Sequence, residues 1–308
     1  MMRYVRFFSR GCRKVVVSAK PPSILILIPY FGMWPFWMPL FLKSCEFNAD
    51  INWLLIGDCG EPVGLPDNVQ YRDCVFTEYC DQVSELLGLA FHPKHPYKLC
   101  DLKPVLGFIH QQEAQTYDFW GFGDLDLVYG DLRSYFTEEK LHRYDFFSTH
   151  ARRVSGHLCL LRNNERMRNL FWQIPAFRER IQDQQHYALD EGGFSRLFLK
   201  RKNFPEPLFR LVGLFNPLRR SAEFREAFST PNGRVSWIDG THDFPDYWQW
   251  EKGCLTNSRM LGMTFPYFHF LGWKRRFNEH PELTEASYIN ALAAAGQWKV
   301  DSRGFHPA

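Results

Sequence analysis

Several patterns that would define a simple class of protein are missing from this sequence. Its eight cysteines form no Cys-x-x-Cys pair and no repeated zinc-ligand spacing, which argues against a zinc module and favours buried small residues in a reducing cytosol. The net charge of +3 is too small for a general nucleic-acid binder. The 308 residues also contain no internal repeat and no low-complexity linker, so we expect one large folded domain.

A secretory signal is missing as well. The first twenty residues carry basic side chains and no acid, but no apolar segment with a small-residue cleavage site follows them. We interpret residues 1–22 as a basic leader, which is either a solvated arm or a segment that rests on an anionic membrane. The basic stretch Leu208–Arg220 could rest on such a membrane as well. We therefore expect a cytoplasmic protein, with peripheral contact at the inner membrane face as an additional location.

One long uncharged run would mark Ile24–Leu42 as a membrane span in a hydropathy window. Pro29, Pro35 and Pro39 would interrupt a helix there repeatedly. The five aliphatic residues Ile24–Ile28 end at a turn signal, which is typical of a buried parallel strand. We therefore expect a strand, a loop and a short helix in place of a span.

What the sequence does contain is an alternation of expected strands and helices. A strand at 24–28 precedes a helix near 39–45, and a strand at 51–56 precedes a loop and a helix at 77–87. Such alternation predicts an α/β fold with a mainly parallel, mixed sheet flanked by helices. The other expected elements are helices at 98–112, 165–172, 177–182, 191–199 and 282–298, strands before residue 124 and at 146–149 and 157–161, and a loop at 204–220.

Two carboxylates, Asp124 and Asp126, lie one residue apart where an aromatic segment stops. Phe119 and Trp120 have strand character, so the pair is expected at the carboxyl end of a strand, where open α/β sheets bind ligands. Carboxylates suit Mg²⁺ and Mn²⁺, which complete their shells with substrate phosphate and water. The simpler interpretation is a turn, because Asp and Gly cluster at strand ends.

Two segments resemble one known family. Gly123-Asp-Leu-Asp-Leu-Val-Tyr-Gly-Asp-Leu132 resembles the metal-binding DXD motif of nucleotide-sugar glycosyltransferases of the GT-A fold, in particular the family-8 glycosyltransferases. Tyr267-Phe-His-Phe-Leu-Gly-Trp-Lys274 resembles the His-Phe-x-Gly-x-x-Lys segment that closes the metal and diphosphate site in that family. This chain is one residue shorter between Gly272 and Lys274 than the family pattern.

The resemblance implies a role for each matching residue. Asp126 and His269 would coordinate Mn²⁺ or Mg²⁺, and Asp124 would coordinate the metal or contact the nucleotide. Gly272 and Lys274 would lie at the diphosphate, where a cation neutralises the departing charge. The alternatives are a core histidine for His269 and a solvated basic turn for Lys274.

A second resemblance covers most of the chain. The stretch from Ile24 to about Phe277, including Pro96–Pro104, resembles a bacterial family of uncharacterised proteins from capsule and lipopolysaccharide gene clusters. This implies a role in surface-polysaccharide biosynthesis, with a lipopolysaccharide O-antigen or a capsule as the acceptor. It names no sugar.

In the GT-A fold, the first two strands and the helix before the metal strand border the nucleotide. The candidates for contact with the base, ribose or phosphates are Pro29, Tyr30, Phe31, Asp58, Lys98, Asp101 and Lys103. Asp58 could instead belong to a turn. Lys98 and Asp101, three apart on one helix face, could instead form a surface ion pair.

Two acids, Asp190 and Glu191, precede Gly192 and Gly193 and resemble the place where inverting GT-A enzymes carry a general base. They could instead cap the following helix, since acids favour helix N-termini. A retaining mechanism, as in family 8, needs no such base. His157 could orient sugar hydroxyls or simply pack in a strand.

Together these features predict a metal-dependent hexosyltransferase with three regions: the leader at 1–22, a catalytic GT-A domain at 23–277 and a helical tail at 278–308. The expected partners are a nucleotide-sugar donor, with a UDP-sugar favoured, and a glycan or lipid-linked glycan acceptor. The alternatives are a nucleotide-sugar hydrolase or nucleotidyltransferase with the same metal–diphosphate site, or a non-catalytic nucleotide-sugar binding protein.

Overall fold

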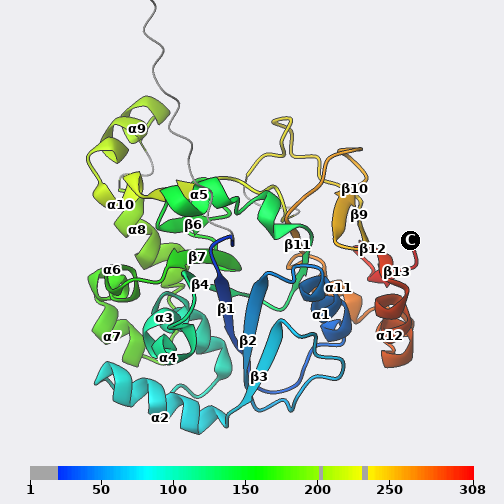
Figure 1. Ribbon diagram of the computed structural model, residues 1–308, viewed down its shortest axis with the longest axis horizontal. Helices are drawn as coiled ribbons and strands as arrows, with labels where there is room; N and C mark the ends of the chain where they lie inside the picture. Colours follow the sequence, from blue (N-terminus) through cyan, green and yellow to red (C-terminus); the bar gives the residue numbers. More distant parts are fainter. Residues whose placement is uncertain (1–19, 201–203, 231–234) are drawn as a thin grey trace, which may run out of the picture.

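The computed structural model describes residues 20–200, 204–230 and 235–308, so the leader proposed at 1–22 lies almost entirely outside the described residues (Figure 1). A seven-stranded sheet has the order β3-β2-β1-β4-β7-β6-β8, and every strand runs parallel to its neighbours except β7. The strands are β1 (Ile24–Pro29), β2 (Ile51–Gly57), β3 (Val69–Asp73), β4 (Phe119–Gly123), β6 (Phe146–Ser148), β7 (Leu158–Arg162) and β8 (Ala222–Phe224). The predicted α/β fold with a mainly parallel, mixed sheet is confirmed.

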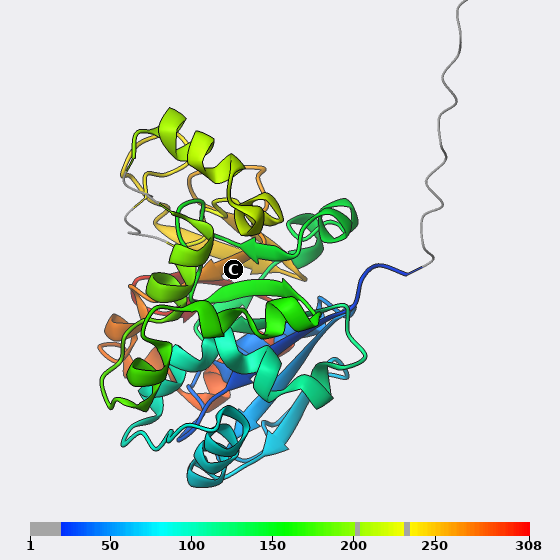
Figure 2. The ribbon, with the colours of Figure 1, turned by 90° about the vertical axis from the view of Figure 1, so that its left-hand side faces the viewer.

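Helices cover both faces of this sheet (Figures 1 and 2). Strand β1 shows why: Leu25 and Leu27 pack into the core on one face, and Ile24, Ile26 and Ile28 pack into the core on the other. The first face is covered by α2 (Phe76–Leu87), η1 (Pro96–Val105), α3 (Leu106–Ile109), α4 (Gln111–Ala114), α6 (Glu165–Arg168), η3 (Leu170–Gln173), α7 (Phe177–Gln182), η4 (Asp190–Phe194) and α8 (Ser195–Phe198). The second is covered by α1 (Met38–Glu46), β5 (Leu127–Tyr129), η2 (Leu132–Ser134) and α5 (Glu138–Arg143).

A third core joins the carboxyl-terminal part of the chain to this body. Its centre is a four-stranded antiparallel sheet, in which Trp250 and Trp298 stack with ring centroids 4.0 Å apart. The strands and helices of this part are β9 (Tyr247–Glu251), β10 (Cys254–Asn257), β11 (Tyr267–His269), α11 (Lys274–Phe277), η5 (Pro281–Leu283), α12 (Ala286–Ala295), β12 (Gln297–Asp301) and β13 (Phe305–His306). β11 pairs with β5 in a separate two-stranded ladder.

The carboxyl-terminal tail predicted at 278–308 is helical only in part. Helix α12 ends where Gly296 adopts a positive φ of 66°, as its sequence indicated. The chain then enters β12 and β13, because Trp298, Val300 and Phe305 are apolar residues that bury in the third core. The tail is therefore an integral part of the second sheet.

The prediction of a loop at 204–220 is wrong. The segment forms α9 (Glu206–Leu214) and α10 (Pro217–Arg220), which lie at the β8 end of the large sheet (Figures 1 and 2). Its prolines begin helices here, since Pro207 and Pro217 occupy first-turn positions where a missing N–H costs no helical hydrogen bond. Asn216 caps α10 by accepting a hydrogen bond from the Leu218 N–H.

Three further expectations need correction or confirmation. Strand β3 occupies part of the region predicted as a loop, and the helix predicted at 98–112 is divided into η1, α3 and α4. The cysteines of the described residues are free, and only Cys45, Cys80 and Cys159 are fully buried, so the expectation of burial holds for those three. Within the described residues, no helix has the length and apolarity needed to cross a membrane.

Candidate functional site

The β5–β11 ladder brings together two motifs that are far apart in the sequence. His269 is paired with Leu127, so it lies beside Asp126 at the end of the ladder. The Phe270 N–H also donates to the Asp126 carbonyl at 3.2 Å. The backbone after β5 can approach the backbone before β11 closely because residue 130 is glycine. A Cβ at that position would lie 2.3 Å from the Phe265 carbonyl oxygen.

The turn that follows β4 is fixed by hydrogen bonds to its backbone. The Asp124 N–H donates to the His157 carbonyl at 3.1 Å, and the Trp37 indole N–H donates to the Leu125 carbonyl at 2.9 Å. The Asp124 and Asp126 carboxylates are therefore held by a rigid backbone at the carboxyl end of a central strand, which is where the sequence placed them.

Asp124, Asp126 and His269 each offer a ligand atom, and these atoms all lie within 4.8 Å of one another. Asp126 and His269 are buried, while Asp124 is partly exposed. His269 Nδ1 lies 3.2 Å from the Thr230 hydroxyl, whereas the buried Nε2 makes no hydrogen bond and lies 3.5 Å from an Asp126 carboxylate oxygen. An oriented imidazole with a free nitrogen beside two carboxylates fits a divalent metal such as Mn²⁺.

Two lysines face these carboxylates. Lys274 Nζ lies 2.7 Å from Asp126, and Lys103 Nζ lies 2.6 Å from Asp124 and donates to the Gly156 carbonyl at 2.7 Å. Burial would raise the pKa of Asp126, but His269 and Lys274 outweigh burial and hold that pKa below its usual range. Burial would likewise lower the pKa of Lys103, but the Asp124 carboxylate outweighs it and raises that pKa. The Asp126 carboxylate and the Lys103 ammonium group are therefore charged in the folded protein.

Lys274 lies beside Asp126 with the shorter spacing after Gly272. Helix α11 begins at Lys274, and its side chain lines the cleft beside Asp126. Gly272 does not line the cleft, whereas Leu271 does.

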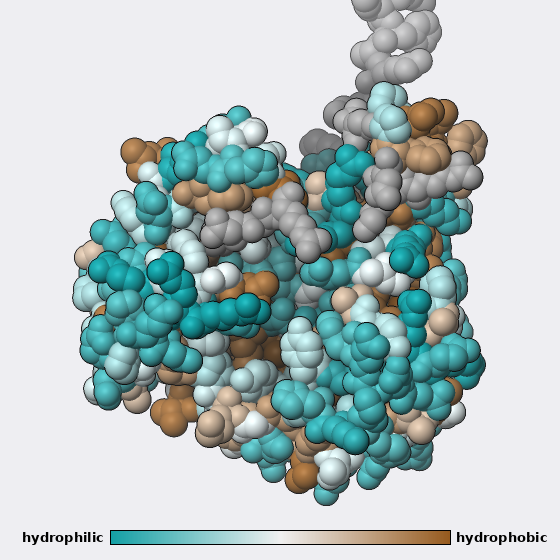
Figure 3. Space-filling model, turned by 180° about the vertical axis from the view of Figure 1, so that it is seen from behind, coloured by the Kyte–Doolittle hydropathy of each residue, from teal (hydrophilic) through white to brown (hydrophobic). Residues whose placement is uncertain are grey.

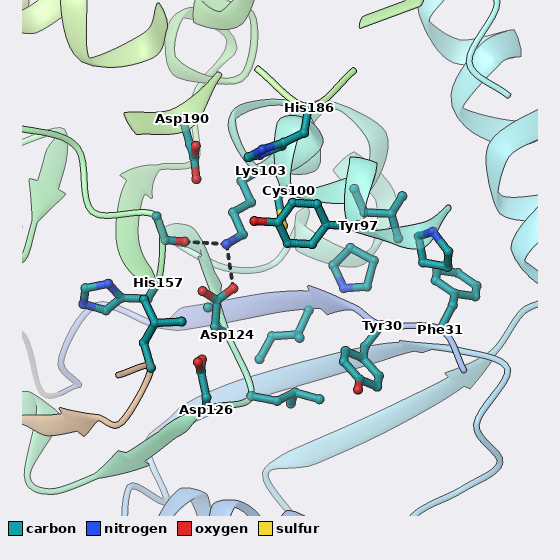
Figure 4. A pocket seen from close by; sticks show the side chains of 18 of the residues that line it. Tyr30, Phe31, Tyr97, Cys100, Lys103, Asp124, Asp126, His157, His186 and Asp190 are labelled. Carbon is teal, nitrogen blue, oxygen red and sulfur yellow. Dashed lines mark hydrogen bonds and ion pairs between the residues drawn. The ribbon is translucent and has the colours of Figure 1, made fainter. Parts of the chain in front are cut away.

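The carboxylates and lysines line a cleft of about 590 Å³. Figure 4 shows Asp124, Asp126 and Lys103 in this cleft. Its walls come from the end of β1, from η1, from the loop before β7 and from the segment that enters η4. Pro29, Tyr30 and Phe31 all line it, although Phe31 is mostly buried against Phe76 and Tyr79. A mainly apolar cleft with a few convergent charges is typical of a small-molecule site.

The 3-10 geometry of η1 decides which of its residues reach the cleft. With about three residues per turn, side chains three apart align in rows. Tyr97, Cys100 and Lys103 form one row, and all three line the cleft, as Figure 4 shows. Lys98 and Asp101 belong to a neighbouring row that does not line it.

Lys98 and Asp101 are therefore placed away from the cleft, and the expected surface ion pair is in fact buried. Their charged atoms lie 3.0 Å apart with almost no exposure of either side chain. Lys98 donates to the Arg180 and Gln185 carbonyls, and Asp101 accepts from the Tyr187 and Leu189 N–H groups. The pair fixes the segment that leads into η4.

Asp58 does not line the cleft either. Its carboxylate accepts a hydrogen bond from the Gly32 N–H at 2.8 Å, across the loop that follows β1. The turn interpretation fits this position, because a short acidic side chain that bonds a nearby N–H stabilises a loop.

Asp190 and Glu191 both line the cleft, on the first turn of the π-helix η4. Burial raises the pKa of Asp190 to about 6. Gly156 passes close by, since a Cβ there would lie 2.8 Å from an Asp190 oxygen and 3.1 Å from a Glu191 oxygen. Figure 4 shows the Asp190 carboxylate above Lys103 and Asp124.

Several cleft residues were not predicted from the sequence, namely Tyr97, Cys100 and His186. A 3-10 period would have indicated Tyr97 and Cys100, because they precede Lys103 by six and three residues. His157, for which both a sugar contact and packing were considered, is buried and stacks on His269 with ring centroids 4.1 Å apart. Its Nε2 lies 2.7 Å from the Tyr267 hydroxyl.

Residues 26–295 match the model of a family of unknown function, DUF6625, and the chain belongs to that family. No curated protein sequence matches the chain.

Solved structures of glycosyltransferases align with most of the chain. The galactosyltransferase LgtC, solved with donor and acceptor sugar analogues, covers 88% of this chain and 95% of its own, with 11% identity and a TM-score of 0.41. Mouse xyloside xylosyltransferase 1 covers 81% of this chain and 97% of its own, with 10% identity and a TM-score of 0.44. Similarity at this level establishes no shared activity, which has to be argued from the cleft itself.

Proposed function

We propose that this chain is a metal-dependent glycosyltransferase that moves a sugar from a nucleotide diphosphate donor to a glycan acceptor. The observation that carries the proposal is the convergence of Asp124, Asp126 and His269 in a cleft of about 590 Å³ that also holds Lys103 and Lys274. Carboxylates and an imidazole suit a divalent metal, and the lysines suit a diphosphate.

Asp124, Asp126 and His269 would hold Mn²⁺ or Mg²⁺. The bound ion would act as a Lewis acid that stabilises negative charge on the departing diphosphate. The buried Asp126 and His269 define a fixed position for the ion, while the more exposed Asp124 faces the cleft where a donor would enter. Thr230 fixes the imidazole so that Nε2 is available as a ligand.

The lysines would bind the diphosphate once the metal compensates the carboxylates. Lys274, whose side chain is 34% exposed, is the more accessible of the two. Lys103 is 11% exposed and anchored to Gly156, so its ammonium group can shift less. We therefore assign Lys274 to the diphosphate, and Lys103 to orienting Asp124 and the adjoining part of the donor.

The nucleoside would occupy the apolar wall near Pro29 and Tyr30. Tyr30 stacks on Trp34 with ring centroids 5.6 Å apart, so its ring is held at the end of β1. A rigid aromatic ring at that position can pack on a base or ribose. A UDP-sugar is the donor that the family-8 resemblance favours.

Asp190 and Glu191 are the groups available for acid–base work. An inverting reaction would need one of them to accept the proton of the acceptor hydroxyl, and a carboxyl with a pKa near 6 is better suited to this than an ordinary aspartate. In a retaining reaction the same carboxylates would instead bind hydroxyls of the sugar. Both assignments place them next to the transferred group.

The acceptor that we propose is a bacterial surface polysaccharide, such as a lipopolysaccharide O-antigen or a capsule, built in the cytoplasm or at the inner membrane face. Its support is the resemblance of Ile24 to about Phe277 to proteins of such gene clusters.

A thermal-shift screen of UDP-, GDP- and CMP-sugars, each with and without Mn²⁺, tests the donor and the metal together. Ligand binding raises the melting temperature by mass action, so we expect a shift with one nucleotide class that depends on the metal. Asp126→Ala should abolish that metal-dependent shift. Equal shifts with and without metal, in wild type and variant, would reject the metal site.

Product analysis then tests the reaction. With donor, metal and a panel of acceptors, a transferase releases the nucleoside diphosphate in an acceptor-dependent manner. Release of free sugar at the same rate without any acceptor identifies a hydrolase, and release of pyrophosphate identifies a nucleotidyltransferase. Tight donor binding without turnover over the whole panel identifies a binding protein.

A further inference from the structure

Helix α9 exposes an apolar face to solvent. Leu208 and Leu211 are 49% and 52% exposed, and Leu214 and Phe215 are 64% and 81% exposed. Among the described residues, four of the fifteen exposed large apolar side chains therefore fall within eight consecutive positions. Single exposed apolar residues are ordinary on a protein surface, but such a concentration marks an interaction site.

The helical period explains how these side chains share one face. At 100° per residue, Leu208, Leu211, Leu214 and Phe215 fall within about 120° of each other around the helix axis. Phe209 points to the other side and is buried in the core beneath. A surface helix normally turns polar residues outward, so α9 has apolar residues on both its buried and its exposed side.

The chain around α9 is strongly basic. Residues 195–225 contain eight basic and two acidic residues, which gives +6, whereas the whole chain carries only +3 and the remainder therefore carries −3. Arg196 and Lys200 are exposed before α9, and Arg220 is exposed after it. Glu223, one of the two acids, lies 3.7 Å from Lys140. The described, exposed basic residues Arg196, Lys200 and Arg220 therefore lie on both sides of α9 in the chain.

We propose that α9 docks on an anionic phospholipid surface. Its apolar side chains would enter the boundary between head groups and acyl chains, and Arg196, Lys200 and Arg220 would contact lipid phosphates. Figure 3 shows apolar surface at the upper right, where α9 lies in that view, so the face is open on the outside of the molecule. The surface fits a lipid-linked acceptor under the proposed function, but it does not depend on that function.

The same charge argues against a second copy of this chain as the occupant. Two copies that met through α9 would bring two segments of +6 together, and like charges repel at close range. An anionic bilayer offers both an apolar interior for the four side chains and a negative surface for the arginines and lysines.

The test is sedimentation of the full chain with vesicles, without donor or metal. We expect co-sedimentation with phosphatidylcholine vesicles that contain phosphatidylglycerol, little with pure phosphatidylcholine, and a decrease as salt rises. The triple variant Leu211→Ser, Leu214→Ser, Phe215→Ser should reduce the fraction bound about tenfold or more. Arg220→Glu should weaken binding to anionic vesicles only.

The matched control replaces exposed apolar residues far from α9, as in Val63→Ser and Leu86→Ser, and should bind as the wild type does. Circular dichroism and the melting temperature establish that each variant folds. Equal binding by the triple variant, or no binding to anionic vesicles by the wild type, would overturn the proposal. So would a dimer in light scattering that the triple variant abolishes.

The vesicle test and the donor test fail separately. Asp126→Ala should lose metal-dependent donor binding and still bind vesicles. The triple variant should lose vesicle binding and retain donor binding, because α9 does not line the cleft.

Discussion

Asp101 and Asp126 are both buried beside a lysine, but their surroundings differ. Asp101 pairs with Lys98 at 3.0 Å and accepts from the N–H groups of Tyr187 and Leu189, and a further titratable neighbour is His186, whose Nε2 lies 3.6 Å away. Asp126 faces a cleft, its lysine is partly exposed, and the neighbouring His269 Nε2 has no hydrogen-bond partner. Asp101 is enclosed by the fold, whereas Asp126 is open to the cleft.

Under the proposed function, this difference separates a structural charge from a functional one. A buried charge whose partners are all satisfied stabilises the arrangement around it, and removal of one partner is costly. A buried polar group left unpaired at a cavity lowers the stability of the fold, and such groups are frequent at ligand sites. The contrast therefore predicts that substitutions at the Lys98–Asp101 pair reduce stability, whereas substitutions at Asp126 and its neighbours reduce ligand binding.

The largest effect is expected from Lys98→Met. It leaves the buried Asp101 without its counter-charge and two carbonyls without a donor, so the free energy of unfolding should fall by about 3–5 kcal/mol. Urea denaturation measures this. Lys43→Met is the matched control, because Lys43 and Glu46 form an ion pair of the same spacing on the surface. It should cost at most about 0.5 kcal/mol. Similar losses in both variants would remove the distinction.

Asp126→Ala should act on function and spare the fold. We expect turnover, or metal-dependent donor binding, to fall roughly a hundredfold to a thousandfold, since the metal position loses a central ligand. Asp118→Ala is the control at the opposite end of the same strand, where Asp118 accepts bonds from Ser23. It should leave donor affinity unchanged. A loss of stability without loss of metal binding in Asp126→Ala would place Asp126 with Asp101.

His269→Ala should weaken the affinity for Mn²⁺ by about ten- to a hundredfold, because one ligand is lost and two remain. Titration of metal into the protein, followed by calorimetry, measures it directly. His110→Ala supplies the contrast: His110 is equally buried, but its Nε2 lies 3.0 Å from the Tyr79 hydroxyl and its Nδ1 lies 3.5 Å from Glu113. That variant should lose stability and keep metal affinity.

The sequence was sufficient to predict where the charged residues at the strand end lie, but it was insufficient for the charged residues on η1. The aromatic strand before Asp124 and the later His269 could be recognised because each belongs to a local pattern. Their proximity depends on the β5–β11 ladder, whose strands are three residues long and too short to show a period.

Helix η1 shows a different limit. Periods of 3.0 and 3.6 residues place Lys98 and Asp101 on one face equally well, and they differ only in whether Lys103 joins Tyr97 and Cys100. The choice depends on packing against the segment before η4, which comes much later in the chain. Propensity alone contains no information on that contact.

The prolines of 204–220 led to the wrong prediction of a loop for a related reason. A proline ends a helix when it falls inside one and begins a helix when it falls in the first turn. Only the position of the helix, set here by burial of Phe209, decides between the two.

The smallest expected effect is also the one whose sign is most informative. Burial raises the pKa of Asp190 from 3.8 to about 6, so the folded chain binds this proton more tightly than the unfolded chain does. Ionised Asp190 therefore destabilises the fold: stability is lost as pH rises from about 4 to about 6, and the loss is complete above that range. Asp190→Asn should raise the free energy of unfolding by about 1–2 kcal/mol at pH 8 and by much less at pH 4.

The control for Asp190→Asn has the opposite sign. The hydrogen bond from His110 lowers the pKa of Glu113 to about 2, so its ionised form stabilises the fold above the unfolded pKa, and this contribution is lost as pH falls toward 2. Glu113→Gln should therefore destabilise the protein at pH 8. Denaturation curves at both pH values measure both variants, and donor turnover is followed in parallel. If Asp190→Asn gains stability and loses turnover, the Asp190 carboxylate lowers the stability of the fold and is needed for the reaction. If it loses stability as Lys98→Met does, Asp190 belongs with the enclosed charges behind η1.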